Sequence, residues 1–273
     1  MAIFSWDNYV DDATVTDSTN SISPHPGTQT IAGTKLQTRQ LSDVARYTFT
    51  STASPLPDLI YDFDLASAKT TDLIAILGYS SNLAGKSFTL AFGTSSGASD
   101  VGTETGTLWN GGEINPRYNH FVYLTSGHSA RYVRLSVHAV AASVVDIGRV
   151  WLNDAYSAQF SMDFNISIKD PSSFTKSRGG SAYASAKNMP RMLSCKAFGL
   201  TNNDFTGNPG LLAMHQAIGT HDEVIILPLT DTSQNLHRLG VYGHIKSNQG
   251  IHVISKSGTA HVTDNRFVVE EDF

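Results

Sequence analysis

The chain of 273 residues has a single cysteine, Cys195, and only 16% of its residues are charged. One cysteine excludes an internal disulfide and any zinc site built on cysteine ligands. Because Cys195 stands at an apolar position of an alternating run, we expect a buried thiol rather than a nucleophile. No stretch approaches the ~18 apolar residues of a membrane helix. The N-terminus lacks a positively charged region followed by an apolar run, so we expect no signal peptide and synthesis in a cytoplasm.

Charge of one sign is not concentrated anywhere in the chain. There are 19 basic and 24 acidic residues, which give a formal net charge of −5. Without a basic face or a polybasic run, we expect neither nucleic acid nor a membrane as a partner. The hydrophobic share of 40% is ample for real cores. The length favours two domains, although one large β-sandwich could also reach this size.

Motifs of catalysis are also missing. The chain has no Gly-x-Ser-x-Gly elbow of a hydrolase and no phosphate-binding loop. Asp62 and Asp64 lie two apart on one predicted strand, which is the only carboxylate pair worth weighing as a glycosidase site. Two polar side chains on the wetted face of a strand explain them better. Asp11 and Asp12 supply too few of the six or more oxygens that calcium needs. We therefore predict no enzyme and no cofactor.

The ten histidines do not follow a metal-binding pattern. There is no pair at helical spacing and no His/Glu spacing typical of zinc enzymes. The candidates weighed are three histidines on successive predicted strands and one local cluster: His244, His252, His261 and the segment 221–223. We expect solvated or ring-stacking side chains and no metal site.

The first half of the chain reads as a series of short strands. Alternating or near-continuous apolar runs separated by turn residues predict strands at 46–51, 58–65, 72–80, 86–94 and 130–137. The stretch from Ala130 to Leu152 holds two strand patterns that we interpret as a closing hairpin. Gly148, inside the second pattern, indicates a bulge or a close backbone approach. Such spacing favours a β-sandwich or jelly roll.

The segment from about Thr14 to Leu152 resembles the discoidin-like, or galactose-binding-like, jelly roll. The runs that carry the resemblance are Asp58-Leu-Ile-Tyr-Asp-Phe-Asp-Leu, Leu73-Ile-Ala-Ile-Leu-Gly-Tyr, Phe88-Thr-Leu-Ala-Phe-Gly-Thr, Ala130-Arg-Tyr-Val-Arg-Leu-Ser-Val and Ile147-Gly-Arg-Val-Trp-Leu. These motifs are those of the fold and not of a ligand. Extracellular members of this family often pin the domain ends with a disulfide, which one cysteine cannot form.

One irregular segment of this half has the residue types of a sugar site. An aromatic ring can stack on a pyranose ring while amide or guanidinium groups bond its hydroxyls. The candidate residues are Trp109, Asn110, Arg117, Tyr118 and His120. The alternative is that Trp109 caps the core or meets a neighbouring subunit.

The second half begins with the cleanest strand pattern of the chain, at 160–169. A further strand is predicted at 190–200, then a helix, and then strands at 223–229, 239–245, 251–255 and 266–270. The helix has Asn208 as its N-cap, Pro209 at its first position and Gly219 as its C-cap, with four residues at helical spacing. Those four are Leu211, Leu212, His215 and Ile218.

Residues 156–273 are similar to the split-barrel ring domain of tailed-phage tail-tip proteins, with the distal tail proteins as the nearest family. The resemblance rests on Phe198-Gly-Leu-Thr-Asn-Asn-Asp, the short helix and the run Val224-Ile-Ile-Leu-Pro. It implies a homo-oligomeric ring, a hexamer, with contacts at Asn208, Leu211, Leu212 and His215. Distal tail proteins usually carry the ring domain first, whereas here the β-sandwich comes first.

The sequence therefore predicts a mainly β protein with two domains, a jelly roll at 1–155 and a β-barrel-like domain with one short helix at 156–273. The resemblance implies a non-enzymatic structural component of a phage virion at the distal tail or baseplate, with the tail tube, hub and other baseplate proteins as partners. The alternative is a carbohydrate-binding, lectin-like module that attaches to host-surface glycans. A carbohydrate-active enzyme would need a two-carboxylate cleft, for which the sequence has no signal.

Overall fold

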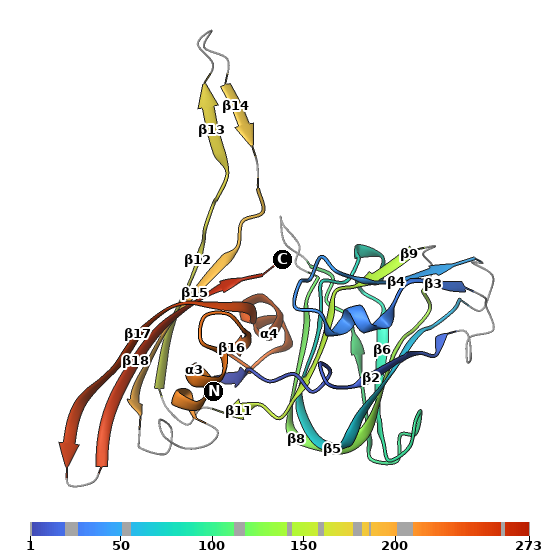
Figure 1. The fold of residues 1–273 in the computed structure, drawn as a ribbon, viewed down its shortest axis with the longest axis horizontal. Coiled ribbons are helices and arrows are strands. Elements are labelled where there is room, and N and C mark those ends of the chain that lie inside the picture. Colours follow the sequence, from blue (N-terminus) through green and yellow to red (C-terminus); the bar gives the residue numbers. More distant parts are fainter. Residues whose placement is uncertain are drawn as a thin grey trace. The chain divides into compact units, whose positions relative to one another are not determined.

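The computed structural model describes residues 2–19, 27–50, 56–111, 118–140, 144–157, 161–176, 182–185, 187–200, 210–257 and 260–272. The chain is mainly β and divides into two compact units (Figure 1). Asp7–Ala155 form one unit, called here the sandwich unit. Met1–Trp6 and Tyr156–Phe273 form the other, called here the arm unit. The first six residues, placed with the jelly roll by the sequence, thus belong with the second half of the chain.

Two antiparallel sheets make up the sandwich unit. The larger has the strand order β10-β5-β8-β6-β7, with β2 also paired to β5, and the smaller has the order β3-β4-β9. The strands of the larger sheet are β2 (Thr14–Asp17), β5 (Leu59–Leu77), β6 (Ser87–Gly93), β7 (Gly102–Thr107), β8 (His120–Val137) and β10 (Arg149–Asn153). Those of the smaller sheet are β3 (Gly27–Ile31), β4 (Ala45–Phe49) and β9 (Val144–Ile147), and two 3-10 turns are η1 (Gly33–Gln37) and η2 (Ser81–Leu83).

β5 and β8 are longer than the sequence predicts. β5 runs through 19 residues and merges two predicted strands. Its middle is exposed, and the register with β8 shifts between Asp64 and Lys69. Ala66 lies there with a φ of 63°, a left-handed conformation that is uncommon for a residue with a Cβ. This irregularity divides β5 into two paired segments, so a single strand contributes to both ends of the larger sheet.

The predicted closing hairpin at Ala130–Leu152 is wrong. β8 pairs with β5 and β6, whereas β10 pairs with β5, so β5 lies between the two halves of the supposed hairpin. Long-range pairing of this kind leaves no trace in local alternation. The close backbone approach at Gly148 is real, because a Cβ there would stand 2.6 Å from the Leu41 carbonyl oxygen.

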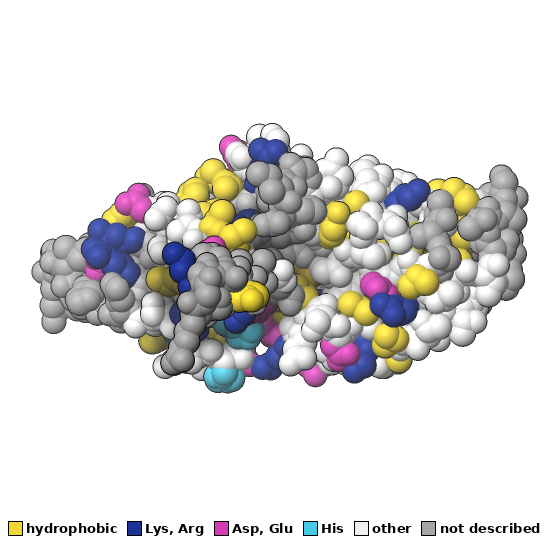
Figure 2. Space-filling model, turned by 90° about the horizontal axis from the view of Figure 1, so that it is seen from above, with side chains coloured by type: hydrophobic (Ala, Val, Ile, Leu, Met, Phe, Trp, Pro, Cys, Tyr) yellow, Lys and Arg dark blue, Asp and Glu magenta, His cyan; other side chains and the backbone are white. Residues whose placement is uncertain are grey.

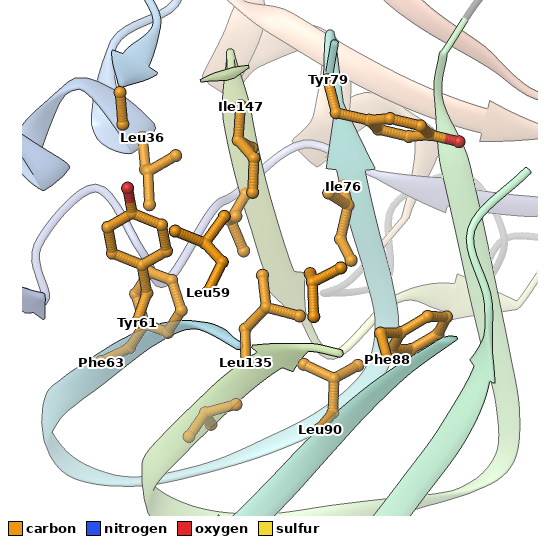
Figure 3. Close-up of a cluster of buried hydrophobic side chains, with 14 of the residues drawn as sticks. Leu36, Leu59, Tyr61, Phe63, Ile76, Tyr79, Phe88, Leu90, Leu135 and Ile147 are labelled. Atoms are coloured by element: carbon orange, nitrogen blue, oxygen red, sulfur yellow. The ribbon is translucent and has the colours of Figure 1, made fainter. Parts of the chain in front are cut away.

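Alternating apolar side chains of both sheets meet in one core (Figure 3). Leu59, Tyr61 and Phe63 of β5 point inward with the period of two that their strand requires. The other labelled residues in the same cluster are Leu36, Ile76, Tyr79, Phe88, Leu90, Leu135 and Ile147. Full burial of one such side chain contributes about 1.5–3 kcal/mol. This core fixes the sheet ends from which the loops emerge.

A single seven-stranded sheet forms the frame of the arm unit, in the order β11-β1-β16-β17-β18-β15-β12 (Figure 1). Its strands are β1 (Ile3–Ser5), β11 (Tyr156–Ser157), β12 (Ser161–Ile168), β15 (Arg191–Leu200), β16 (Glu223–Leu227), β17 (Val241–Ser257) and β18 (Ala260–Glu271). β1 is held by β16 on one side and β11 on the other. The sheet has ends at β12 and β11, and no closed barrel forms among the described residues.

Two short helices accompany this sheet. α3 (Leu211–Ile218) buries Leu211, Met214 and Ile218 in the core of the arm unit, and Gly219 ends it with a φ of 53°. The predicted N-cap, Asn208, lies outside the described residues. α4 (Ser233–Leu239), which the sequence analysis does not predict, is capped by the Thr232 hydroxyl, which accepts from the Asn235 N–H at 3.1 Å. No helix in the described ranges has the length and apolar character to cross a membrane.

A buried ion pair ties the last strand to the rest of the arm unit. The Arg191 Nε lies 3.0 Å from both carboxylate oxygens of Glu271, and its guanidinium also donates to the backbone carbonyls of Arg238 and Gly240. Both side chains are almost fully buried. With the carboxylate and the guanidinium both bonded, the charges are neutralised where water cannot reach them.

A ribbon projects from the sheet beyond the pairing of β12 with β15 (Figure 1). Its far part is a two-stranded sheet of β13 (Ser173–Lys176) and β14 (Ala182–Ser185). We call residues 169–187 the arm. The regular pairing of β12 with β15 ends at Ile168 and Arg191, and the Lys169 N–H donates to the Pro190 carbonyl at 2.9 Å.

Candidate functional site

The candidate sugar residues of the sequence gather at one end of the sandwich unit, around the corner that follows β5. Gly78 makes this turn with a φ of 61°, which suits glycine. The Gly78 N–H donates to the Asn119 side-chain oxygen at 2.8 Å, and the Tyr79 N–H donates to the Tyr118 carbonyl at 3.2 Å. Two loops distant in sequence are thus fixed to one corner.

Trp109 is held at this corner through its backbone. The Tyr79 hydroxyl donates to the Trp109 carbonyl at 2.5 Å, and the Trp109 N–H donates to the His120 Nδ1 at 3.2 Å. Burial raises the pKa of Tyr79, so the phenol stays protonated and remains a donor. Because Nδ1 accepts, the neutral His120 ring carries its proton on Nε2.

The remaining candidates divide into exposed and supporting residues. Trp109 and Tyr118 are half-buried and Asn110 is exposed, whereas His120 is only 6% exposed. The His120 ring packs edge-on against Phe88 with centroids 5.0 Å apart. His120 therefore supports the loop from beneath instead of facing a ligand. Arg117 lies outside the described residues.

Tyr79 is the central residue that the sequence analysis missed. Its ring lies 5.8 Å from the ring of Tyr118, and its hydroxyl points away from the core cluster (Figure 3). Tyr79 lies at the end of an apolar strand pattern, so that pattern predicts only that its side chain is in the core. The glycine before it was the available signal, since Gly-Tyr at a strand end indicates a turn that directs the tyrosine toward the loops. Two aromatic side chains, one buried phenol and one exposed amide thus meet at one loop end.

Asp62 and Asp64 do not form a paired-carboxylate site. The two Arg134 nitrogens donate to Asp62 at 2.6 and 2.8 Å, and Ser18 adds a third bond at 2.5 Å. Arg131 binds Asp64 in the same bidentate way, at 2.7 and 2.8 Å, and lowers the pKa of that carboxyl. Each carboxylate is neutralised by its own arginine. Both belong to the polar face of the larger sheet.

No group of three histidine, cysteine or acidic side chains that could hold a metal ion occurs in the described part of the chain. His244 pairs with Asp272 at 2.6 Å, while the side chains of His252 and His261 lie outside what the structure describes. Asp11 binds the buried guanidinium of Arg149 at 2.8 Å, which gives this carboxylate a structural role. Cys195 is buried, and burial raises the pKa of its thiol to about 12.

The four residues proposed for a subunit contact occupy different environments. Leu211 is fully buried in the arm unit. His215 packs edge-on against Phe267 with centroids 5.4 Å apart and lies 3.1 Å from the Asn265 side-chain oxygen. Leu212 is half-exposed, and Asn208 lies outside the described residues. Of the three candidates that the structure describes, Leu212 has the side chain best placed for an outside partner.

Charge on the visible surface is dispersed. Figure 2 shows the described Lys and Arg side chains in several small groups, with Asp and Glu among them, and not in one continuous patch on that face. A duplex or a membrane surface would need a continuous basic face. The face shown is therefore unlike either kind of binding surface.

Comparisons with known proteins find similarity in structure only. No protein-family model and no curated protein matches the chain. Among solved structures, CpGH89CBM32-6 of Clostridium perfringens is 16% identical, with 54% of this chain and 99% of that chain covered and a TM-score of 0.36. A mutant lectin-binding domain of lectinolysin complexed with Lewis b is 14% identical (56% and 99% covered, TM-score 0.38). A fucose-binding module of Streptococcus pneumoniae is 10% identical (54% and 95% covered, TM-score 0.38).

These neighbours are carbohydrate-binding jelly-roll modules, and each covers about half of this chain. At such TM-scores the likeness carries no argument about what this chain binds. The comparisons give no support to a tail or baseplate identity. The functional argument therefore rests on the site itself.

Proposed function

We propose that the sandwich unit is a non-catalytic, lectin-like carbohydrate-binding module for glycans of a cell surface. The observation that carries the proposal is the loop end at which Trp109 and Tyr118 are both held against Tyr79, beside the exposed amide of Asn110. Half-buried aromatic rings offer a flat apolar face to a pyranose, and the amide offers both a donor and an acceptor to its hydroxyls.

Pre-organisation of this loop end also favours binding. The backbone of Trp109 and Tyr118 is fixed by hydrogen bonds to Tyr79 and His120, so a sugar meets a loop whose main chain is already in place. Less side-chain and loop entropy is then lost on binding. Asp62 and Asp64 are each bound in an ion pair with an arginine, which agrees with a module that binds a sugar without catalysing a reaction on it.

The test is a glycan array on the purified full chain, followed by calorimetric titration of the best glycan against Trp109→Ala. The hydrogen bonds of Trp109 to Tyr79 and His120 use its backbone atoms, so this substitution removes the ring and leaves these loop attachments. We expect at least about tenfold weaker binding, equivalent to about 1.4 kcal/mol.

The matched control is Tyr183→Ala, which removes an exposed aromatic ring from the arm unit. Unchanged affinity in the control together with loss in Trp109→Ala supports the site. Equal affinity of both variants for the glycan, or no glycan bound by the array, would sink the proposal. Circular dichroism of each variant checks that the fold is retained.

We infer a second candidate function from the arm unit: a structural component of a tailed-phage virion at the distal tail or baseplate. The observation in its favour is the open seven-stranded sheet with a projecting ribbon, since free strand edges are suited to pairing between subunits. In this proposal the chain forms a sixfold ring that joins the tail tube to hub, tail-tip or receptor-binding proteins. Closed rings satisfy edges that are otherwise exposed.

Negative-stain images of the purified chain, alone and with isolated tail tubes of the phage that encodes it, test this second function. Rings of one stoichiometry seated at tube ends are expected. Particles that neither form rings nor attach to tubes would refute the virion role and leave the sugar-binding proposal untouched.

A further inference from the structure

No side chain that the structure describes in the arm belongs to a buried core cluster. The β13–β14 sheet consists of four residue pairs, and an isolated two-stranded ribbon is marginally stable at best in water. Those of its side chains that the structure describes are exposed, and Tyr183 is 62% exposed. At the arm's base, Ile168 is 66% exposed. A large aromatic side chain thus faces solvent on the arm, and a large aliphatic one faces solvent at the last position of β12.

The arm also differs in charge from the rest of the chain. By sequence it contains four basic residues, Lys169, Lys176, Arg178 and Lys187, and one acidic residue, Asp170, which give a formal charge of +3. Because the whole chain carries −5, the remainder carries −8. Opposite net charges attract, so the remainder of another copy of the same chain is an electrostatically favourable partner for the arm.

The described arm lysines leave this charge available. Lys169 binds Glu270 at 2.9 Å at the base of the arm. Lys176 and Lys187, farther out, are exposed. Exposed carboxylates elsewhere in the chain include Asp12, Asp100 and Asp154. Opposite charges on the two surfaces would speed encounter and fix orientation, while the apolar side chains supply buried area.

The strand next to the arm adds a second surface for such a contact. β12 ends the sheet, and in the described sheet its only paired neighbour is β15, so the backbone groups of its outer edge point away from the sheet. A free edge of eight residues is long enough to accept a strand from outside. The arm begins where this edge stops, at Ile168, so the two surfaces are adjacent along the chain.

We propose that the arm of one copy packs against exposed carboxylates on the remainder of a second copy of this chain and holds the copies together. This interaction surface is independent of sugar binding, and it does not require that the copies close into a ring. Its predicted signature is self-association that weakens as salt screens the charges.

Light scattering coupled to size exclusion on the full chain, at low and high salt, is the first test. An oligomer at low salt that dissociates at high salt is the expected result. A chain that is monomeric at every concentration and salt level overturns the proposal. Glycan titration in the same buffers is scored separately, so failure of one proposal is distinguishable from failure of the other.

Matched charge reversals locate the contact. Lys176→Glu lies on the arm, whereas Lys86→Glu makes the same change at a half-buried lysine of the sandwich unit. We expect Lys176→Glu to raise the dissociation constant of the oligomer about tenfold and Lys86→Glu to change it less than twofold. Equal effects of the two substitutions would overturn the assignment to the arm.

Removal of the arm gives the largest change. Replacing residues 170–189 by Asn-Gly joins Lys169 to Pro190, which already face each other across a backbone hydrogen bond, and Asn-Gly favours a tight hairpin turn. The variant should fold, as its circular dichroism and sugar binding would show, and be monomeric. Retention of the oligomer by the folded variant contradicts the proposal.

Zero-length cross-linking of a mixture of ¹⁵N-labelled and unlabelled chains directly identifies the molecule that the arm contacts. Mass spectrometry should find mixed-isotope links between Lys176 or Lys187 and carboxylates of the other copy. Links confined to single chains would show that the arm packs on its own molecule, and this result would overturn the proposal. The experiment uses the natural chain and needs no variant.

Discussion

The sandwich unit and the arm unit are both antiparallel β structures, but they use their apolar residues differently. In the sandwich unit two sheets enclose one core in which Tyr47, Phe63, Phe88 and Phe92 are nearly inaccessible. In the arm unit one sheet with two short helices encloses a smaller core, and the β13–β14 ribbon extends beyond it. A closed core presents rigid loops suited to a ligand, whereas an open sheet with a ribbon presents edges suited to another protein.

The two units also handle charge differently. In the sandwich unit each described arginine–carboxylate pair keeps at least one partly exposed member: both side chains of Arg131–Asp64 are partly exposed, and the buried guanidinium of Arg149 meets a partly exposed Asp11. The arm unit buries its Arg191–Glu271 pair. Solvent-exposed pairs contribute about 0–1 kcal/mol, but a buried pair cannot lose one member without leaving a charge unsolvated. The comparison therefore predicts unequal sensitivity of the units to substitution.

The largest effect is expected from the core of the sandwich unit. Phe63→Ala removes a fully buried ring and should lower the free energy of unfolding of that unit by about 3–5 kcal/mol. Tyr183→Ala, on the exposed arm, should change it by less than about 0.5 kcal/mol. Urea denaturation followed by signals from each unit measures both, because a two-unit chain need not unfold in one step. Similar losses in the two variants would break the comparison.

The buried ion pair should give the next largest effect. Arg191→Met leaves the Glu271 carboxylate buried without its partner and should destabilise the arm unit by about 3 kcal/mol. Restoring an apolar partner in Arg191→Met with Glu271→Leu should recover much of that loss. The corresponding exposed change, Arg131→Met, should cost less than about 1 kcal/mol. A double-mutant cycle in urea compares the three, and equal costs at the buried and exposed pairs would contradict the distinction.

A histidine of α4 makes the arm unit sensitive to acid. Burial lowers the pKa of His237 from its usual 6.5 to about 4. Below pH 6.5 the unfolded chain binds a proton that folded His237 does not accept until about pH 4, so stability falls as pH falls through this window. We expect a loss of about 1–2 kcal/mol, allowing for partial solvent access. The difference between the stability profiles of the natural chain and His237→Gln isolates this effect, and parallel profiles would refute it.

Much of the sandwich unit follows from its sequence, because each strand carries its own alternation of apolar and polar residues. The run at 130–137 lies within the observed strand β8, and the runs at 58–65 and 86–94 match β5 and β6 to within one residue at the ends they share. Pairing partners do not follow, since β5 pairs with residues 44 to 80 positions away along the chain, from Ile76↔His120 to Leu73↔Asn153. The membership of β1 in the arm unit was equally invisible, because three residues are too few to show a period.

The candidate site could also be predicted in part, because local sequence patterns distinguish loops from strands. Trp109, Asn110 and Tyr118 stand out in a segment without periodicity, so their place on a loop end could be expected. Tyr79 could not be separated from the core run that it ends. The helix α3 could be predicted from its apolar spacing and from Gly219. The helix α4 could not, because its sequence is polar and Thr232 is its only local signal. Patterns within an element can be read from the chain, but contacts between elements cannot.

The smallest predicted effect concerns the thiol in the core of the arm unit. Burial raises the pKa of Cys195 to about 12, so the folded thiol stays protonated where an unfolded one, near pH 8.5, begins to ionise. Stability should therefore fall by about 1 kcal/mol between pH 8.5 and 9.5, and Cys195→Ser or Cys195→Ala should lack this slope. At pH 8 a thiol reagent should react only as fast as the arm unit opens, and the arm-unit substitution Arg191→Met should accelerate it while Phe63→Ala in the sandwich unit should not. Rapid labelling of the natural chain would show that the arm unit's core is open to solvent and that the two units differ less than their burial indicates.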